Sequence, residues 1–271
     1  MVLMKLITIK ELPAWYEVNP YVTEGYRQPM SLLNTFRTLF QWHNETLNIY
    51  THLLPGLYFL ACVLFTAPEC SGHCRSLWYA GYWAATTMGL NSAIGHTFYS
   101  SGPRYNQLAW RLDFIGVIAI NSMHLVSDTF VVCSILLNSI ELYYAVVSVE
   151  IAWILFVMYR VCGGSFQVAQ EWSFLLPFLT CVPLTLPLYA YVHVYVENPH
   201  LYAIVQSSLH CTLCILVAGI VFLKGRLPER LYRHRVLDYV SSHVLHHLFC
   251  VGAVLSAFRV FPLIEYYQST V

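Results

Sequence analysis

The chain has 271 residues, of which 58% are hydrophobic and 10% are charged, and its formal net charge is zero. A soluble globular domain carries about 25% charged residues, so this composition indicates that lipid is the solvent for much of the chain. The balanced charge gives no basic bias of the kind that nucleic-acid binding needs. We therefore expect membrane lipid, and no nucleic acid, as a partner.

Long apolar runs follow one another along the chain and are separated by short connections. A run of about 18 or more mostly apolar residues can cross a hydrocarbon core of roughly 30 Å as a helix. A helix also satisfies its own backbone polar groups in lipid. We predict seven transmembrane helices, at residues 49–67, 77–98, 114–136, 142–159, 172–196, 201–223 and 237–263.

The predicted fold class is all-α, a seven-helix transmembrane bundle. Residues 1–48 are expected to form a cytoplasmic N-terminal segment, residues 49–263 the seven-helix domain and residues 264–271 a short outer tail. The connections leave no room for a second folded domain. Prolines predict a kink in the fifth helix, which neighbouring helices can tolerate in a bundle; they are Pro177, Pro183 and Pro187.

Lysine and arginine positions predict how the chain is oriented in the membrane. If the N-terminus is cytoplasmic, two of the 14 basic residues lie on the outer side, Arg75 and Arg259, and the others lie on the cytoplasmic side. Cytoplasmic loops retain positive charge. The asymmetry therefore predicts a cytoplasmic N-terminus, an extracellular or lumenal C-terminus, and an integral multi-pass protein of the plasma membrane or an endomembrane.

The nine cysteines do not indicate a disulfide framework, because most lie inside predicted helices. Cys70 and Cys74 share a short outer loop, where they could be oxidised to a disulfide or stay reduced. Cys211 and Cys214 form a C-x-x-C pair in mid-membrane without a second pair. Small packing residues are therefore a better interpretation of that pair than a zinc ribbon.

Polar and ionisable side chains gather toward the cytoplasmic ends of four predicted helices. Such groups are costly inside a membrane and are candidates for function by default. Residues spaced by three, four or seven positions share one face of a helix. The set comprises Glu45, Asn48 and His52 of the first helix, Ser92 and His96 of the second, Asp113 of the third, and Asp238, Ser242, His243, His246 and His247 of the seventh.

Three imidazoles from two helices, with a carboxylate at the same depth, suit a zinc site. Catalytic zinc takes three protein ligands and leaves the fourth position for water. His243 and His247 can hold one ion from one helix face, and His96 can close the site from the second helix. His246 lies three residues after His243 and is an alternative ligand. The glutamate of the H-E-x-x-H metalloprotease motif is absent, and the histidines could instead bind one another and no metal.

Three more polar residues of the third helix share the face of Asp113, namely Asn121, His124 and Asp128. They could line a wet path to the outer side, but hydrogen bonds between helices or a position in a cavity wall are the favoured interpretations. Glu150 in the fourth helix has no predicted partner.

The loop of residues 224–235 carries five basic residues. The favoured interpretation is that they fix the orientation of the chain. The alternative is contact with anionic lipid headgroups, to which each base near the surface contributes roughly 1 kcal/mol. Its candidates are Arg230, Arg233 and Arg235.

At these residues the sequence resembles the progestin and adipoQ receptor (PAQR) family, over nearly the whole chain from the G-Y-R of residues 25–27 onward. Three family motifs occur in order at the expected helix ends. The first, E-x-x-N-x-x-x-H, is similar to residues 45–52. The second, S-x-x-x-H followed by D, is similar to residues 92–96 with Asp113. The third, H-x-x-x-H, is similar to residues 243–247, and residues 227–230 (L-P-E-R) resemble the family's lead into the last helix.

The resemblance implies zinc as the cofactor, held by His96, His243 and His247. Asp113 would hold or activate the water on the zinc, and Ser92 would stand in the polar surroundings, where it could stabilise a developing oxyanion. The first motif would brace the site through Glu45, Asn48 and His52. The family's topology, with the N-terminus inside and the C-terminus outside, agrees with the charge distribution.

Within the family, residues 54–60 and 96–100 look most like the membrane progestin receptor branch, and the family is related to alkaline ceramidases. The resemblance therefore implies a receptor for a steroid or other small lipid signal whose zinc site hydrolyses ceramide-like lipid amides. The alternative is a non-catalytic, zinc-stabilised membrane scaffold that tethers cytoplasmic partners. Three histidine ligands favour chemistry, because a structural zinc usually has four protein ligands.

The predicted orientation can be tested with two epitope tags. A tag at residue 1 should be reached by antibody only after the cell is permeabilised, and a tag after residue 271 should be reached from the outside or from the lumen. Finding both tags on one side of the membrane would mean an even number of spans, and the polar residues would then no longer share one depth.

Overall fold

The structure, a computed structural model, describes residues 5–16, 18–68 and 72–270. Its regular elements are helical except for one antiparallel pair of short strands within these ranges, β1 (Leu6–Ile7) and β2 (Tyr26–Arg27). The all-α class is therefore confirmed. Cys70 lies outside the described residues, so the structure does not test its pairing with Cys74.

The bundle is formed by nine helices, α2 to α10, among the described residues. Two of them continue into π-helical turns, α4 into η3 (Val131–Leu136) and α8 into η4 (Ala218–Lys224). The helices are α2 (Thr46–Phe65), α3 (Gly72–Phe98), α4 (Pro103–Phe130), α5 (Ile140–Gly163), α6 (Phe166–Leu179), α7 (Cys181–Tyr195), α8 (Pro199–Val217), α9 (Ser242–Phe258) and α10 (Val260–Thr270).

Five of the helical stretches among the described residues are long and apolar enough to cross a membrane. They are Thr46–Phe65, Pro103–Leu136, Ile140–Gly163, Pro199–Lys224 and Ser242–Glu265. They identify the chain as an integral multi-pass membrane protein. The other two predicted spans correspond to α3, which is 27 residues long but less apolar, and to the pair α6 and α7.

The predicted kink in the fifth span is a full break at Thr180, which ends α6 and precedes α7. Pro183 is the third residue of α7 and lacks a backbone N–H. A proline is tolerated in the first turn, where the N–H groups have no partner within the helix. The chain therefore starts a new helix just before Pro183.

The last membrane helix begins at Ser242, five residues later than predicted, because residues before it form the short turn η5 (Arg235–Asp238). Asp238 is thus outside the helix. Its carboxylate accepts a hydrogen bond of 2.5 Å from the backbone N–H of Thr23. Asp238 therefore fastens the N-terminal segment and does not belong to the row of site residues on α9.

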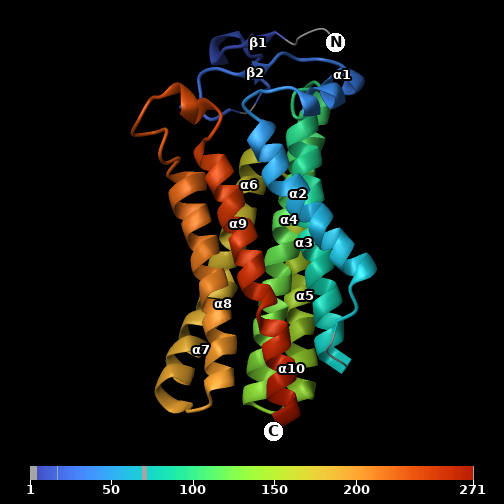
Figure 1. Ribbon diagram of the computed structural model, residues 1–271, viewed down its shortest axis with the longest axis vertical. Helices are drawn as coiled ribbons and strands as arrows, with labels where there is room; N and C mark the ends of the chain where they lie inside the picture. Colours follow the sequence, from blue (N-terminus) through green and yellow to red (C-terminus); the bar gives the residue numbers. More distant parts are fainter. Residues whose placement is uncertain (1–4, 17, 69–71, 271) are drawn as a thin grey trace.

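The N-terminal segment is ordered and covers one end of the bundle. After β1 it contains η1 (Ile9–Glu11), β2, α1 (Leu32–Arg37) and η2 (Thr38–Phe40). A small apolar core holds it together, formed by Ile7, Tyr16, Val22 and Tyr26 with Tyr99 packed against them. Figure 1 shows this segment at one end of the molecule and the C-terminus at the other.

Glycines let the backbones of α2, α3 and α4 approach closely. A Cβ atom at Gly89 of α3 would lie 2.6 Å from the Cα atom of Gly56 on α2. A Cβ atom at Gly95 would lie 2.8 Å from the carbonyl oxygen of Ala109 on α4. Small residues permit such contacts between membrane helices. Because Gly95 precedes His96, this packing sets the distance from His96 to α4.

A buried polar cluster links α4 to α7 and α8. Asp128 accepts hydrogen bonds from Ser208 at 2.6 Å and from Thr185 at 2.8 Å. His124 bonds to Thr212 at 3.0 Å. These contacts confirm that His124 and Asp128 join helices through hydrogen bonds.

Two other polar residues make simpler contacts. The amide group of Asn121 donates to the carbonyl oxygen of Val117 on its own helix at 2.8 Å. Glu150 of α5 accepts a hydrogen bond from the hydroxyl of Thr129 on α4. This bond gives Glu150 the partner that the sequence alone did not predict.

Candidate metal centre

Three histidines from two helices converge at the end of the bundle that the N-terminal segment covers. One nitrogen of each ring, from His96 on α3 and from His243 and His247 on α9, lies within 4.8 Å of the corresponding nitrogens of the other two. The Nε2 atoms of His96 and His243 are 3.2 Å apart. Zn–N bonds of about 2.0–2.1 Å in a tetrahedral site imply a similar separation between ligand nitrogens.

The other nitrogen of His96 is fixed by the carboxylate of Glu45, the residue just before α2. Its Nδ1 atom lies 2.7 Å from Oε2 of Glu45. An ionised carboxylate can only accept, so Nδ1 carries a proton, and in the neutral ring Nε2 then has the lone pair. Metal-binding histidines are commonly held by a carboxylate in this way. Glu45 also accepts a hydrogen bond of 2.8 Å from the side-chain amide of Asn48.

His247 is fixed in the same manner by the backbone of α2. Its Nδ1 atom lies 3.1 Å from the carbonyl oxygen of Asn48 and 3.2 Å from the hydroxyl of Thr51. The carbonyl can only accept, so Nδ1 donates and Nε2 again has the lone pair. Two lone pairs turned into one small space repel each other unless a proton or a cation lies between them. The donor set therefore fits a metal ion that binds neutral imidazoles.

His52 completes the first motif by stacking on a ligand ring. Its ring centroid lies 3.8 Å from that of His247, with an interplanar angle of 13°. Both ring nitrogens of His52 are buried and have no hydrogen-bond partner among the described residues. The three predicted bracing residues contact two of the three candidate ligands: Glu45 holds His96, and Asn48 and His52 contact His247.

His246 points to a different neighbour. Its Nδ1 atom lies 3.1 Å from the carbonyl oxygen of Ala218 on η4, and its Nε2 atom lies 3.6 Å from the sulfur of Cys250. The nitrogen atoms that converge belong to His247 and not to His246. The geometry therefore favours the third ligand expected from the resemblance over the alternative.

The two residues expected to act in chemistry lie at different positions relative to the histidines. Oδ2 of Asp113 is 3.9 Å from Nε2 of His96, too far for a direct hydrogen bond. Such a gap can be bridged by water. Ser92 is fully buried one turn before His96, and its hydroxyl has no partner among the described residues.

Arg27, which sequence reasoning did not select, holds the end of α3. Its side chain is fully buried. The guanidinium donates to the carbonyl oxygens of His96 at 2.6 Å and Thr97 at 2.8 Å, and to the hydroxyl of Thr38 at 2.9 Å. Carbonyls at the end of a helix lack partners and carry partial negative charge. Arg27 therefore satisfies the backbone of His96 itself.

Glu229 holds the start of α9 in a comparable way. Its carboxylate accepts hydrogen bonds from the backbone N–H of Ser242 at 2.8 Å, from the hydroxyl of Ser242 and from the side-chain amide of Asn19 at 2.7 Å. A carboxylate is favourable at a helix N-terminus. The only signal for Arg27 and Glu229 in the sequence is that they lie in the G-Y-R and L-P-E-R stretches of the resemblance.

His43 supports the position of Glu45 from the N-terminal segment. Burial, with the nearby charge of Arg27, lowers the pKa of His43 to about 3. The ring is therefore neutral near pH 7, and its Nδ1 atom accepts the backbone N–H of Glu45 at 3.1 Å. This hydrogen bond fixes the backbone of Glu45, and so helps to position the carboxylate that holds His96.

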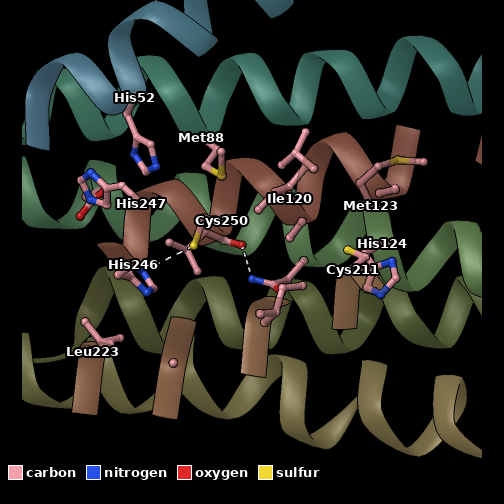
Figure 2. Close-up of a pocket in the computed structure, with 18 of the residues that line it drawn as sticks. His52, Met88, Ile120, Met123, His124, Cys211, Leu223, His246, His247 and Cys250 are labelled. Atoms are coloured by element: carbon pink, nitrogen blue, oxygen red, sulfur yellow. Dashed lines mark hydrogen bonds between the residues drawn. The ribbon is translucent and has the colours of Figure 1, made fainter. Parts of the chain in front are cut away.

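An apolar cavity extends from the histidines into the bundle. Figure 2 shows His52, His246 and His247 at one end of it, sulfur-bearing and apolar side chains along its length, and His124 at the other end. Its wall includes His52, His247, Met88, Ile120, Met123 and Cys211. The cavity has the character of a site for an apolar chain or ring system.

A more polar cavity lies on the other side of the histidines, against the N-terminal segment. Asn19, Glu45, Arg226 and Ser241 are in its wall. Asp113 and His243 line both cavities. The candidate metal centre therefore lies where an apolar compartment meets a polar one.

Arg27→Met tests whether the buried arginine holds the site. The substitution keeps an apolar stem of similar length but leaves the carbonyls of His96 and Thr97 without their donor. Hydrogen bonds to charged groups contribute about 1.5–3 kcal/mol each, so we expect a clear fall in melting temperature. Arg37→Met is the matched control, because Arg37 is exposed and its side chain bonds to Asn34. Equal melting temperatures for the two variants would contradict this role of Arg27.

Comparison with known proteins places the chain in a family. The sequence model described as haemolysin-III related matches residues 40–258. The chain is 24% identical to the ADIPOR-like receptor IZH2 of Saccharomyces cerevisiae, over 95% of this chain and 83% of that protein. It is 23% identical to heptahelical transmembrane protein 3 of Arabidopsis thaliana, over 94% of this chain and 86% of that protein.

A third relative is progestin and adipoQ receptor-like protein 1 of Caenorhabditis elegans, 30% identical over 42% of this chain. The chain covers 27% of the length of that protein, and several other relatives are also covered over less than two thirds of their length. The membrane progestin receptor branch stays a prediction, because these relatives do not single it out. The family model and these relatives together show that the chain belongs to the haemolysin-III-related family of PAQR-type membrane proteins.

Proposed function

We propose that the chain is a receptor for a steroid or other small lipid signal, and that a zinc site within it hydrolyses the amide bond of ceramide-like lipids. His96, His243 and His247 would hold the zinc. The observation that carries the proposal is the orientation of two of these rings. Contacts from the N-terminal end of α2 occupy Nδ1 of His96 and of His247 and leave both Nε2 atoms for a metal.

The proposal includes seven spans with the N-terminus in the cytoplasm. Five helical stretches are long and apolar enough to span the membrane. We assign the other two spans to α3 and to the pair α6 and α7. The chain ends lie at opposite ends of the molecule (Figure 1), as an odd number of spans requires. The excess of basic residues on the side of the N-terminal segment supports its cytoplasmic location.

The chemistry would combine the metal with groups of this chain. A zinc ion lowers the pKa of a bound water and polarises a carbonyl. Asp113 would orient the attacking water and accept its proton, a contribution typically of about 10²–10⁴-fold. Its Oδ2 atom lies 3.9 Å from Nε2 of His96, close enough for one water to contact both atoms. The unpartnered hydroxyl of Ser92 would donate to the oxyanion that develops on the carbonyl.

The two cavities support an amphipathic substrate. An acyl chain would occupy the apolar cavity, and the polar part of the lipid would occupy the cavity beside the N-terminal segment. The bond between them would then lie next to Asp113 and His243, which line both. A steroid signal would bind in the apolar cavity and would not be hydrolysed, because it has no amide bond.

The loop before α9 supports a contact with anionic headgroups. Arg230, Arg233 and Arg235 are all exposed there, beside exposed Leu231 and Tyr232. Basic residues flanked by apolar side chains suit a membrane surface that carries negative charge. These three arginines would contact the headgroups; the alternative is that they only fix the orientation of the chain.

Asp113→Asn tests the hydrolytic part of the proposal. The substitution is nearly isosteric and should keep the fold and the zinc content, but it removes the proton acceptor. Fatty-acid release from a ceramide-like substrate should fall by about 10²–10⁴-fold. Zinc content and fatty-acid release are measured on the same preparation, with Glu141→Gln at the exposed start of α5 as the matched control.

A His96→Ala variant sets the background for that assay. If wild-type protein with full zinc releases no more fatty acid than this variant, hydrolysis of these substrates is excluded. The zinc would then be structural in a receptor or a scaffold.

A further inference from the structure

One stretch of the N-terminal segment reverses the usual placement of polar and apolar side chains. In residues 32–42, which we term the rim segment, Thr35 is fully buried and Thr38 is 2% exposed. The large apolar side chains face outward instead. Their exposed fractions are 39% for Leu32, 60% for Leu33, 50% for Phe36, 75% for Phe40 and 56% for Trp42.

Polar contacts hold the inner face of the rim segment in this orientation. The hydroxyl of Thr35 accepts a hydrogen bond from Ser101 at 2.8 Å, and that of Thr38 accepts one from Arg27 at 2.9 Å. The hydroxyl of Tyr50 on α2 donates to the carbonyl oxygen of Leu39 at 2.9 Å. The outward position of the apolar residues is therefore built into the fold.

The rim segment borders a membrane-spanning helix. Ser101, which bonds to Thr35, lies two residues before α4 begins, and α4 starts one of the five apolar spans. The first turns of α4 expose Tyr105 and Leu108. Figure 1 shows α1 at the margin of the bundle, beside the end of the helices. The apolar face thus continues the lipid-facing surface of the bundle.

We propose that the rim segment lies in the membrane leaflet on the side of the N-terminal segment, with Leu33, Phe36 and Phe40 in contact with acyl chains. Contiguous apolar surface of this kind marks an interaction site, and short amphipathic segments rich in Leu, Phe and Trp lie in the membrane interface. Trp42 would stand at headgroup depth, where tryptophan is enriched. Arg37 is exposed on the same segment and would contact headgroups.

The basic loop described above provides a second point of contact with the same leaflet. Leu231 and Tyr232 are 68% and 69% exposed there. In Figure 1, α1 of the rim segment and this loop lie on opposite margins of the bundle, while Trp42 at the end of the rim segment stacks on Tyr239 just after the loop. Contacts on two margins would fix both the depth and the tilt of the covered end.

Photocrosslinking of the full chain in nanodiscs tests the proposal. p-Benzoylphenylalanine is introduced in place of Phe36 or, in a second variant, Phe40, and the nanodiscs contain phosphatidylcholine and phosphatidylserine. After irradiation, lipid adducts are measured by intact-protein and peptide mass spectrometry. The same probe in place of Leu155, 64% exposed on α5, reports lipid contact, and in place of exposed Lys10 it reports water.

The proposal predicts lipid adducts at Phe36 and Phe40 with yields near that of the Leu155 position and far above that of the Lys10 position. Yields at the Lys10 level for both variants would overturn it. The same variants are also irradiated in vesicles that hold several copies of the chain. A crosslinked product of twice the mass of the chain would also overturn the proposal, because a second copy of the chain would then cover the rim segment. Unchanged elution volume and melting temperature establish that each variant is folded.

Discussion

Hydrogen bonds from the N-terminal end of α2 fix a histidine on each of two other helices. These bonds determine which ring nitrogens are free to bind a metal at the end of the bundle that the N-terminal segment covers. Glu45 accepts a hydrogen bond from Nδ1 of His96 on α3, and the carbonyl of Asn48 accepts one from Nδ1 of His247 on α9. Without these acceptors either ring could present a protonated nitrogen to the centre, which would weaken the binding of a cation by the cluster. The proposed metal site, and the chemistry proposed for it, depend on this arrangement of protons.

The N-terminal segment secures both helices that carry the candidate ligands. Arg27 bonds to the backbone of His96, and Glu229 joins Asn19 to the first residue of α9. The rim segment supports Arg27 in turn through Thr38. If the rim segment lies in the leaflet, a short chain of contacts leads from lipid to the metal centre, so that the state of the membrane and the geometry of the site are linked.

The sequence predicted the class of fold from local pattern, and the same spacing gave candidate site histidines, whereas the choice of His247 over His246 came from the family resemblance and stays a prediction. Apolar length indicates membrane helices, and residues four apart share a helix face, which brings His243 and His247 together. It did not predict Arg27 or Glu229, since their partners lie 69 and 13 residues away and no periodicity links them. Asp238 was wrongly assigned to the last helix because the apolar pattern continues through the turn that precedes it.

The most direct test of the account is the zinc content of purified protein and of two neighbouring histidine variants. His247→Ala and His246→Ala remove the same side chain from adjacent positions of α9, so a difference between them isolates the geometry of the site. We expect about one zinc per chain in wild-type protein and in His246→Ala, and loss of zinc in His247→Ala, because a site that loses one of three ligands binds metal far more weakly. Retention of zinc by His247→Ala with loss in His246→Ala, or folded wild-type protein that binds no zinc, would contradict the account.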